Sequence, residues 1–155
     1  MKITIAAVGR LGRGSEATLA REYAERAAAA GRQLGIGPVE IAEVEGRKPG
    51  REAEGQALLA AVPEGAHVIA CDERGVPWPS RGFASHIGVL RDRGVRHLVL
   101  LIGGADGLSE EAKAAAKEHL AFGPQTWPHA LVRAMLAEQV YRAVTILAGS
   151  PYHRD

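Results

Sequence analysis

The sequence has only one cysteine, Cys71, among its 155 residues. A single thiol can form neither an internal disulfide nor a zinc site built from several cysteines. The six histidines stand at positions 67, 86, 97, 119, 129 and 153, and no two of them have the short spacing of motifs such as H-E-x-x-H. The sequence therefore predicts no metal ion, and structural roles for His67 and His97 near the starts of strands.

Long hydrophobic segments and an excess of one charge are also missing. No run of about 18 apolar residues occurs, and no small-residue cleavage site follows the apolar N-terminus. We therefore predict a soluble, cytoplasmic protein with no membrane partner. The 19 basic and 18 acidic side chains give a net charge of +1, whereas proteins that bind naked nucleic acid are usually strongly basic. Composition thus gives RNA binding no support.

Common nucleotide-binding and hydrolase motifs are missing as well. The glycines of residues 9–14 follow the pattern G-x-x-G-x-G rather than G-x-G-x-x-G, and no lysine follows as in a Walker A loop. No G-x-S-x-G sequence supplies a hydrolase nucleophile. Residues 9–14 are interpreted as a mobile turn between a strand and a helix. A nucleotide-binding regulator that uses this turn is kept as an alternative.

The sequence does contain a regular alternation of strand-like and helix-like segments. Strands are predicted at 2–9, 38–44, 66–71 and 95–102, and a short extended piece at 120–122. Helices are predicted at 15–34, 51–62, 81–93, 109–119 and 128–143. Because no repeat or linker divides the chain, residues 1–155 are expected to form one α/β domain, with a mostly parallel sheet and helices on both faces.

Two strand ends carry candidate ligand-binding residues, since open parallel sheets bind ligands at the carboxyl ends of their strands. Asp72 follows the strand at 66–71, and an acidic group there can hold ribose hydroxyls or can simply be solvated. Gly103 and Gly104 follow the strand at 95–102. Adjacent glycines either let a ligand approach the backbone or serve a tight turn at positive φ. These residues alone leave both interpretations open.

Five segments, taken in order, resemble a known family: Ile102–Leu108, Thr126–His129, Val132–Arg133, Glu138–Ala143 and Pro151–Arg154. Ala7–Gly9 and the residues Asp72, Gly75, Pro77 and Trp78 agree with the same family. The sequence is similar to the bacterial methyltransferases of the SPOUT superfamily that act on N3 of a pseudouridine in 23S ribosomal RNA. The resemblance covers essentially the whole chain.

The resemblance implies a Rossmann-like α/β fold whose C-terminal part is threaded as a deep trefoil knot, a feature that spacing alone does not reveal. It also implies a homodimer, S-adenosyl-L-methionine as the cofactor, and 23S rRNA in the ribosome as the partner. An apolar stripe between Leu131 and Val140 is a candidate subunit interface. In this family, the tail of one subunit is expected to complete the site of the other.

Site residues follow by resemblance. The cofactor-binding set is Cys71 (chiefly through its backbone), Gly103, Phe122, Gly123, Pro124, Gln125, Thr126 and Trp127. The loop departs from the family's usual Leu/Ser-rich sequence, because it reads Phe-Gly-Pro-Gln before the threonine. The catalytic set is Tyr152, which would stack on a base, His153, which would take or relay a proton, Arg154, which would hold phosphate or stabilise an anion, and Arg142.

Two alternatives within this fold remain. One is a SPOUT methyltransferase that acts on another RNA base. The other is a ribosome-associated binding module that has lost catalysis. The Pro151–Arg154 tail argues against the first, and the intact pair Gly103 and Gly104 argues against the second.

Overall fold

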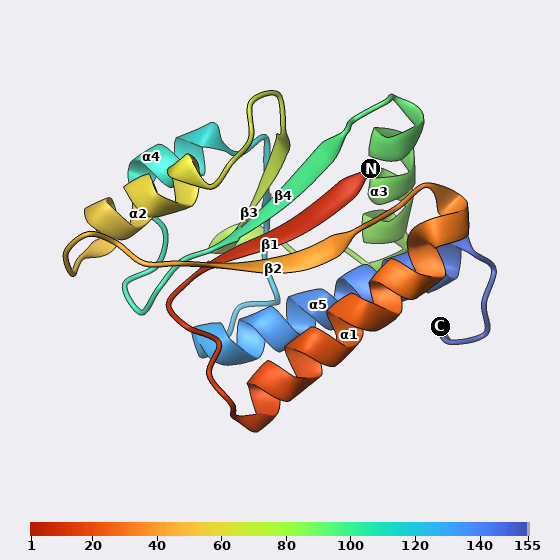
Figure 1. Cartoon of the computed structure of the whole chain (residues 1–155), viewed down its shortest axis with the longest axis horizontal. Helices are drawn as coiled ribbons and strands as arrows, with labels where there is room; N and C mark the ends of the chain where they lie inside the picture. Colours follow the sequence, from red (N-terminus) through yellow and green to blue (C-terminus); the bar gives the residue numbers. More distant parts are fainter. Residues whose placement is uncertain (155) are drawn as a thin grey trace.

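The computed structural model describes residues 1–154, and within them a five-stranded sheet forms the centre of the molecule (Figure 1). The strands lie in the order β2-β1-β4-β3-β5, and all four neighbouring pairs are parallel. Their bounds are β1 Lys2–Val8, β2 Val39–Val44, β3 His67–Val76, β4 His97–Ile102 and β5 Glu118–Leu120. The predicted α/β class with a mostly parallel sheet is confirmed.

Helices cover both faces of this sheet (Figure 1). The helices α1 (Ser15–Gly31), α3 (Ser80–Asp92) and α5 (His129–Leu147) lie on one face, and α2 (Arg51–Ala60) and α4 (Glu110–Ala115) lie on the other. Successive side chains of a strand point to opposite faces. In β1, Ile5 accordingly joins the core under α1, α3 and α5, and Ala6 joins the core under α2 and α4.

The chain between α4 and β5 differs from the prediction. A helix over 109–119 was expected, but α4 ends at Ala115 and the backbone of Ala116 is extended. The amide of Lys117 donates to the carbonyl of Val68 at 2.9 Å, and Glu118 pairs with Ile69. Pairing with β3 therefore overrides the helical pattern of these alanines, and β5 begins two residues before the expected extended piece.

Two further elements are longer than predicted. The strand expected at 66–71 continues as β3 to Val76, which pairs with Leu120 after an irregularity. The final helix, α5, runs to Leu147 rather than to 143, because Val144 and Thr145 are buried in the core. No helix within residues 1–154 combines the length and the apolar sequence needed to cross a membrane.

Candidate functional site

A cavity of about 390 Å³ lies at the carboxyl ends of β3 and β4. Residues 71–74 at β3, the turn 102–108 after β4, and residues 120–127 between β5 and α5 form most of its wall. Small-molecule sites usually occupy roughly 300–1,000 Å³ and occur at this edge of parallel sheets. The cavity therefore has the position and the size of a cofactor site.

Seven of the eight residues predicted to bind the cofactor line this cavity: Cys71, Gly103, Phe122, Gly123, Gln125, Thr126 and Trp127. Pro124 lies in the same loop but is not part of the wall. Residues 9–14 do not contribute to the cavity either, so the alternative of a nucleotide site at this glycine-containing turn gains no support from the cavity.

The two glycines after β4 are needed for close packing. Neither Gly103 nor Gly104 has a positive φ, whereas Gly107 has φ of 77°. A Cβ on Gly103 would lie 2.5 Å from the carbonyl carbon of Gly107, and a Cβ on Gly104 would lie 2.6 Å from Oε2 of Glu54. The interpretation of these two glycines as positive-φ turn residues is therefore wrong. The missing side chain of Gly103 lets the turn fold back on itself, and the missing side chain of Gly104 makes room for Glu54 of α2.

The loop between β5 and α5 is held by its own hydrogen bonds. The indole Nε1 of Trp127 donates to the carbonyl oxygen of Phe122 at 3.1 Å. The amide of Ala121 donates to the carbonyl of Val76 at 3.1 Å, which attaches the start of the loop to β3. Trp127 is 39% exposed although its ring is large and apolar. The loop thus presents an aromatic side chain at the cavity that a bound ligand could cover.

Cys71 contributes to the cavity at the point where β3 is still paired on both sides. Burial raises the pKa of the Cys71 thiol to about 12. The thiolate is the reactive form of cysteine, and it is therefore absent at neutral pH. A covalent role for this side chain is unfavourable, which agrees with the prediction that Cys71 acts chiefly through its backbone.

An ion pair between Asp72 and Lys113 forms a polar part of the wall. Lys113 Nζ lies 3.0 Å from Asp72 Oδ2, and the amide of Arg74 donates to Asp72 Oδ1 at 2.8 Å. Partial burial acts to raise the pKa of Asp72, but the hydrogen bonds from Arg74 and Lys113 outweigh it and hold that pKa below its usual value. Asp72 was a candidate from its place after a predicted strand, whereas Lys113 was not, since no spacing connects a residue of α4 to β3.

The lowered pKa of Asp72 makes part of the stability depend on pH. The stabilisation is complete above the unfolded-state pKa of about 3.9 and is lost as the pH falls through the lower folded-state value. We expect Asp72→Asn to lower the melting temperature at pH 7, and the difference from wild type to shrink as the pH falls from about 5 toward 3. Thermal melts monitored by circular dichroism check this. Asp106→Asn, at an exposed position of the same cavity, is the control, and a difference independent of pH would contradict the assignment.

The predicted catalytic residues gather at the other end of α5. Arg142 donates twice to Glu138 Oε1, from Nη2 at 2.6 Å and from Nε at 3.0 Å, and the Tyr152 hydroxyl donates to the same oxygen at 3.0 Å. Arg142 Nη1 lies 3.2 Å from Nδ1 of His153, and its guanidinium lies 4.8 Å from the centre of the Tyr152 ring. The tail is therefore docked on α5. Arg154 is exposed beyond this cluster.

Neither part of the predicted site reaches the other within one chain. Val132 is the residue furthest along α5 that lines the cavity, and Arg142 lies 10 positions beyond it on the helix. At 1.5 Å per residue the separation is roughly 15 Å along the helix axis. Figure 1 shows the chain leaving α5 at the end of that helix opposite to the side on which the strands β1 and β4 finish.

Arg133 is a buried cation that the sequence analysis noted only as part of a family segment. Its side chain is 1% exposed, and Nη2 donates to the carbonyl of Val8, the last residue of β1. Its Nε has no hydrogen-bond partner among residues 1–154. Burial lowers the pKa of Arg133. This guanidinium holds the carboxyl end of β1 against α5, next to the cavity but outside its wall.

The chain belongs to the SPOUT methyltransferase family, because the family model described as "Predicted SPOUT methyltransferase" matches residues 1–153. Proteins of this class use a methyl-donor cofactor. The resemblance inferred from the sequence is thus confirmed.

The relatives at high identity carry one particular name. "Ribosomal RNA large subunit methyltransferase H" of Phenylobacterium zucineum is 67% identical over 155 residues, which cover all of both chains. The protein of the same name from Caulobacter sp. strain K31 is 68% identical over the same coverage, and that of Caulobacter vibrioides is 64% identical over 100% of this chain and 99% of its own.

A solved structure agrees on the fold. "The structure of a probable methylase family protein from Haemophilus influenzae Rd KW20" superposes with a TM-score of 0.53, covering 99% of this chain and 70% of the other. Its sequence identity is 12%, so the similarity supports the arrangement of strands and helices and nothing finer.

Proposed function

We propose that this chain transfers a methyl group from S-adenosyl-L-methionine to N3 of a pseudouridine in 23S ribosomal RNA, acting in the cytoplasm on assembled ribosomes. The observation that carries the proposal is the cavity at the carboxyl ends of β3 and β4, lined by seven of the eight residues expected from the family resemblance. The full-length relatives named as ribosomal RNA large subunit methyltransferases support rRNA as the substrate.

The wall of the cavity fits S-adenosyl-L-methionine. Ile102, Leu108, Leu120 and Phe122 offer apolar surface for the adenine ring, and Gly103 contributes to the same wall. Acidic side chains and backbone groups suit the ribose hydroxyls and the amino group of the cofactor. When bound, the cofactor supplies an electrophilic methyl group on a sulfonium. The chain's own task is alignment of donor and acceptor, which can contribute about 7–11 kcal/mol to lowering the barrier.

A homodimer would unite the two halves of the site. A shallow hollow between α1 and α5 is lined mainly by apolar residues, among them Leu19, Leu131 and Met135. Phe122 lines both this hollow and the cofactor cavity, and Glu138 lines the hollow and holds the tail. A second copy seated on the hollow would place its tail beside this chain's cavity. The deep trefoil knot of the family is part of the same proposal.

The tail cluster is suited to a base that must lose a proton. A guanidinium only donates hydrogen bonds, so Arg142 Nη1 is the donor in its contact with Nδ1 of His153. In the proposed reaction, His153 takes or relays the proton that leaves N3 of the acceptor base, and Arg142 and Arg154 supply positive charge for the deprotonated ring. A positioned acid or base of this kind typically contributes about 10²–10⁴-fold.

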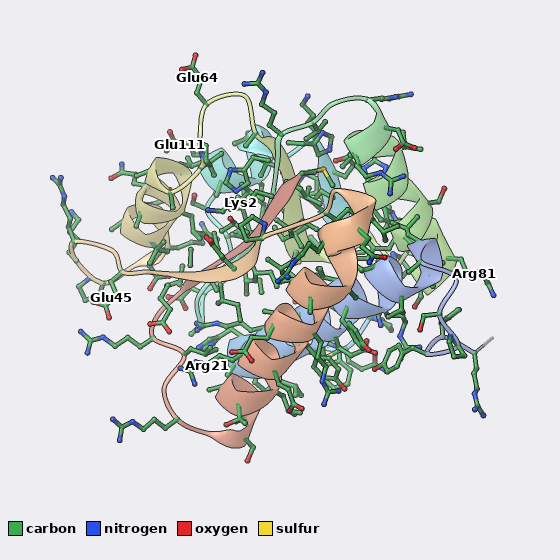
Figure 2. All side chains as sticks on the ribbon, turned by 45° about the vertical axis from the view of Figure 1, so that its right-hand side comes forward. Lys2, Arg21, Glu45, Glu64, Arg81 and Glu111 are labelled. Carbon is green, nitrogen blue, oxygen red and sulfur yellow. The ribbon has the colours of Figure 1, made fainter. Side chains whose placement is uncertain are left out.

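The nearly balanced charge supports a folded target over naked RNA. Figure 2 shows the labelled side chains Arg21, Glu45 and Glu64 at the outside of the molecule, so both signs occur on the surface. With a net charge of +1 the chain has little general attraction for phosphates. Recognition by the shape of an assembled ribosome fits such a surface better.

The proposal is tested by supplying labelled S-adenosyl-L-methionine together with ribosomes that lack the modification, and with naked rRNA in parallel. We expect label on a single pseudouridine in ribosomes and at least tenfold less in naked rRNA. Label on another base would indicate the alternative SPOUT specificity. Cofactor binding without transfer to either substrate would indicate the non-catalytic module, and tighter binding of NAD or ATP than of the cofactor would indicate the nucleotide-binding regulator.

A further inference from the structure

Three side chains meet at the amino end of β3, outside the cofactor cavity. His67 is the first residue of β3, Glu118 is the first residue of β5, and His86 lies in α3. One ligand atom from each lies within 4.8 Å of the other two. His67 Nε2 is 2.6 Å from Glu118 Oε2, and His86 Nε2 is 3.4 Å from Glu118 Oε1. The cluster brings together residues with up to 51 positions between them, which explains why no spacing motif predicted it.

One nitrogen in this cluster makes a contact without hydrogen-bond geometry, because His86 Nε2 lies 3.4 Å from Glu118 Oε1. His86 Nε2 is buried and makes no hydrogen bond among residues 1–154. The Trp78 ring lies edge-on to the His86 ring at 5.1 Å, and the His67 ring lies edge-on to it at 5.7 Å. The His86 imidazole therefore points toward Glu118 without a hydrogen bond, and an ion at the centre of the cluster would give its Nε2 a direct partner.

The two histidines and the glutamate form a ligand set that is typical of Zn²⁺. Two imidazole nitrogens and one carboxylate oxygen suit Zn²⁺ and its neighbours in the transition series, whereas Mg²⁺ and Ca²⁺ require mainly oxygen ligands. With metal–ligand bonds of about 2.0–2.2 Å, tetrahedral geometry places ligand atoms about 3.3 Å apart. The pair His86 and Glu118 already has this separation. His67 Nε2 lies 2.6 Å from the other carboxylate oxygen, Oε2. Because the three ligand atoms lie within 4.8 Å of one another, shifts of about 1–1.5 Å would bring them to tetrahedral spacing.

We propose that His67, His86 and Glu118 bind one Zn²⁺ ion, with a water in the fourth position. This reverses the expectation from the sequence that the chain binds no metal. His67 is buried at 8% exposure, and His86 and Glu118 are half-buried, so an ion can enter from the surface. The ion would tie α3 to the starts of β3 and β5. Because β5 leads directly into the loop 121–127, the site would anchor the strand that positions one wall of the cofactor cavity.

The test uses full-length, tag-free protein treated with a chelator and then titrated with Co²⁺ or Zn²⁺ alone. We expect one ion per chain, a visible Co²⁺ spectrum of tetrahedral type with nitrogen and oxygen ligands, and a melting temperature that Zn²⁺ raises. His86→Gln should weaken the affinity at least tenfold. The matched control is His97→Gln: His97 starts the neighbouring strand β4 and bonds Thr4 at 2.8 Å, on the other face of the sheet. The His97→Gln variant should bind Zn²⁺ or Co²⁺ with the affinity of wild type.

The outcomes separate metal binding from a purely hydrogen-bonded cluster. His86→Gln should fold in the metal-free form, since its ring nitrogen makes no hydrogen bond there; if it does not, Glu118→Gln serves as the second variant. The proposal is overturned if wild type shows no one-to-one binding, if neither variant weakens it, or if the Co²⁺ spectrum carries the intense thiolate band of a ligand such as Cys71. All of these readouts are independent of methyl transfer, so a failure of the metal site leaves the proposed function untouched.

Discussion

Removing residues 152–155 is expected to abolish methyl transfer while the affinity for S-adenosyl-L-methionine stays within a few-fold of wild type. The deleted segment carries Tyr152, His153 and Arg154, and none of these lines the cofactor cavity of its own chain. Isothermal titration with the cofactor and transfer of labelled methyl to ribosomes measure the two effects. Normal turnover by the shortened chain would rule out a catalytic tail. A thermal melt of the same preparation shows whether loss of the Tyr152 contacts with Glu138 and Arg142 has disturbed α5.

Mixing two inactive variants tests whether the tail acts across a dimer. The shortened chain keeps its cavity, and a chain with Gly103→Val keeps its tail. In a symmetric dimer, random exchange at equal amounts makes half of the dimers mixed, and each of those has one complete site. We expect recovery of about a quarter of wild-type activity if the tail of one subunit completes the other's site. No recovery, from subunits shown to exchange, would place each site within one chain.

Gly103→Val is expected to weaken cofactor binding at least tenfold and to lower the melting temperature. The structure gives a reason beyond blocking of the adenosine, because even a Cβ would lie 2.5 Å from the backbone of Gly107. The turn must therefore move, and overpacking of this kind typically costs about 1–3 kcal/mol. Since 1.4 kcal/mol corresponds to a factor of ten in affinity, the lost affinity should be measurable by titration.

A second glycine provides the matched control. In α3, a Cβ on Gly82 would meet nothing closer than Pro79 Cδ at 3.6 Å, which is an ordinary contact. Gly82→Val should leave cofactor affinity unchanged. If both variants bind normally, the assignment of Gly103 to the cofactor site is wrong; if both lose affinity equally, the effect is one of general stability.

Most strands and helices were predictable because their hydrophobic periodicity is local. The run of β-branched and aliphatic residues in β4 and the glycines that follow it indicate a strand end without any other part of the chain. The alanine-rich segment around Ala115 misled the prediction, because its helical pattern continues past the true end of α4. The hydrogen bond from Lys117 to Val68 decides that boundary, and it depends on a strand far away in the sequence.

The site was predictable only in part. Family resemblance pointed to Gly103 and the loop 122–127, and these residues do share one cavity. Lys113 could not be predicted as a site residue, because its ion pair with Asp72 forms only when α4 packs against the end of β3. The role of the glycine pair stayed open in the sequence, because a requirement for close packing looks the same there as a requirement for positive φ, and only the structure excludes positive φ.

Local sequence was enough to predict the α/β class, the parallel sheet, the family and many residues that line the cavity at the ends of β3 and β4, because periodicity and short motifs are properties of neighbouring residues. Long-range packing was needed to show three other features: that α4 ends where β5 pairs with β3, that Arg142, which contacts the tail, lies roughly 15 Å along α5 from the last cavity residue of that helix, and that His67, His86 and Glu118 converge. These three features depend on contacts between elements that are far apart in the sequence, and a local sequence pattern does not indicate which of their side chains will be in contact.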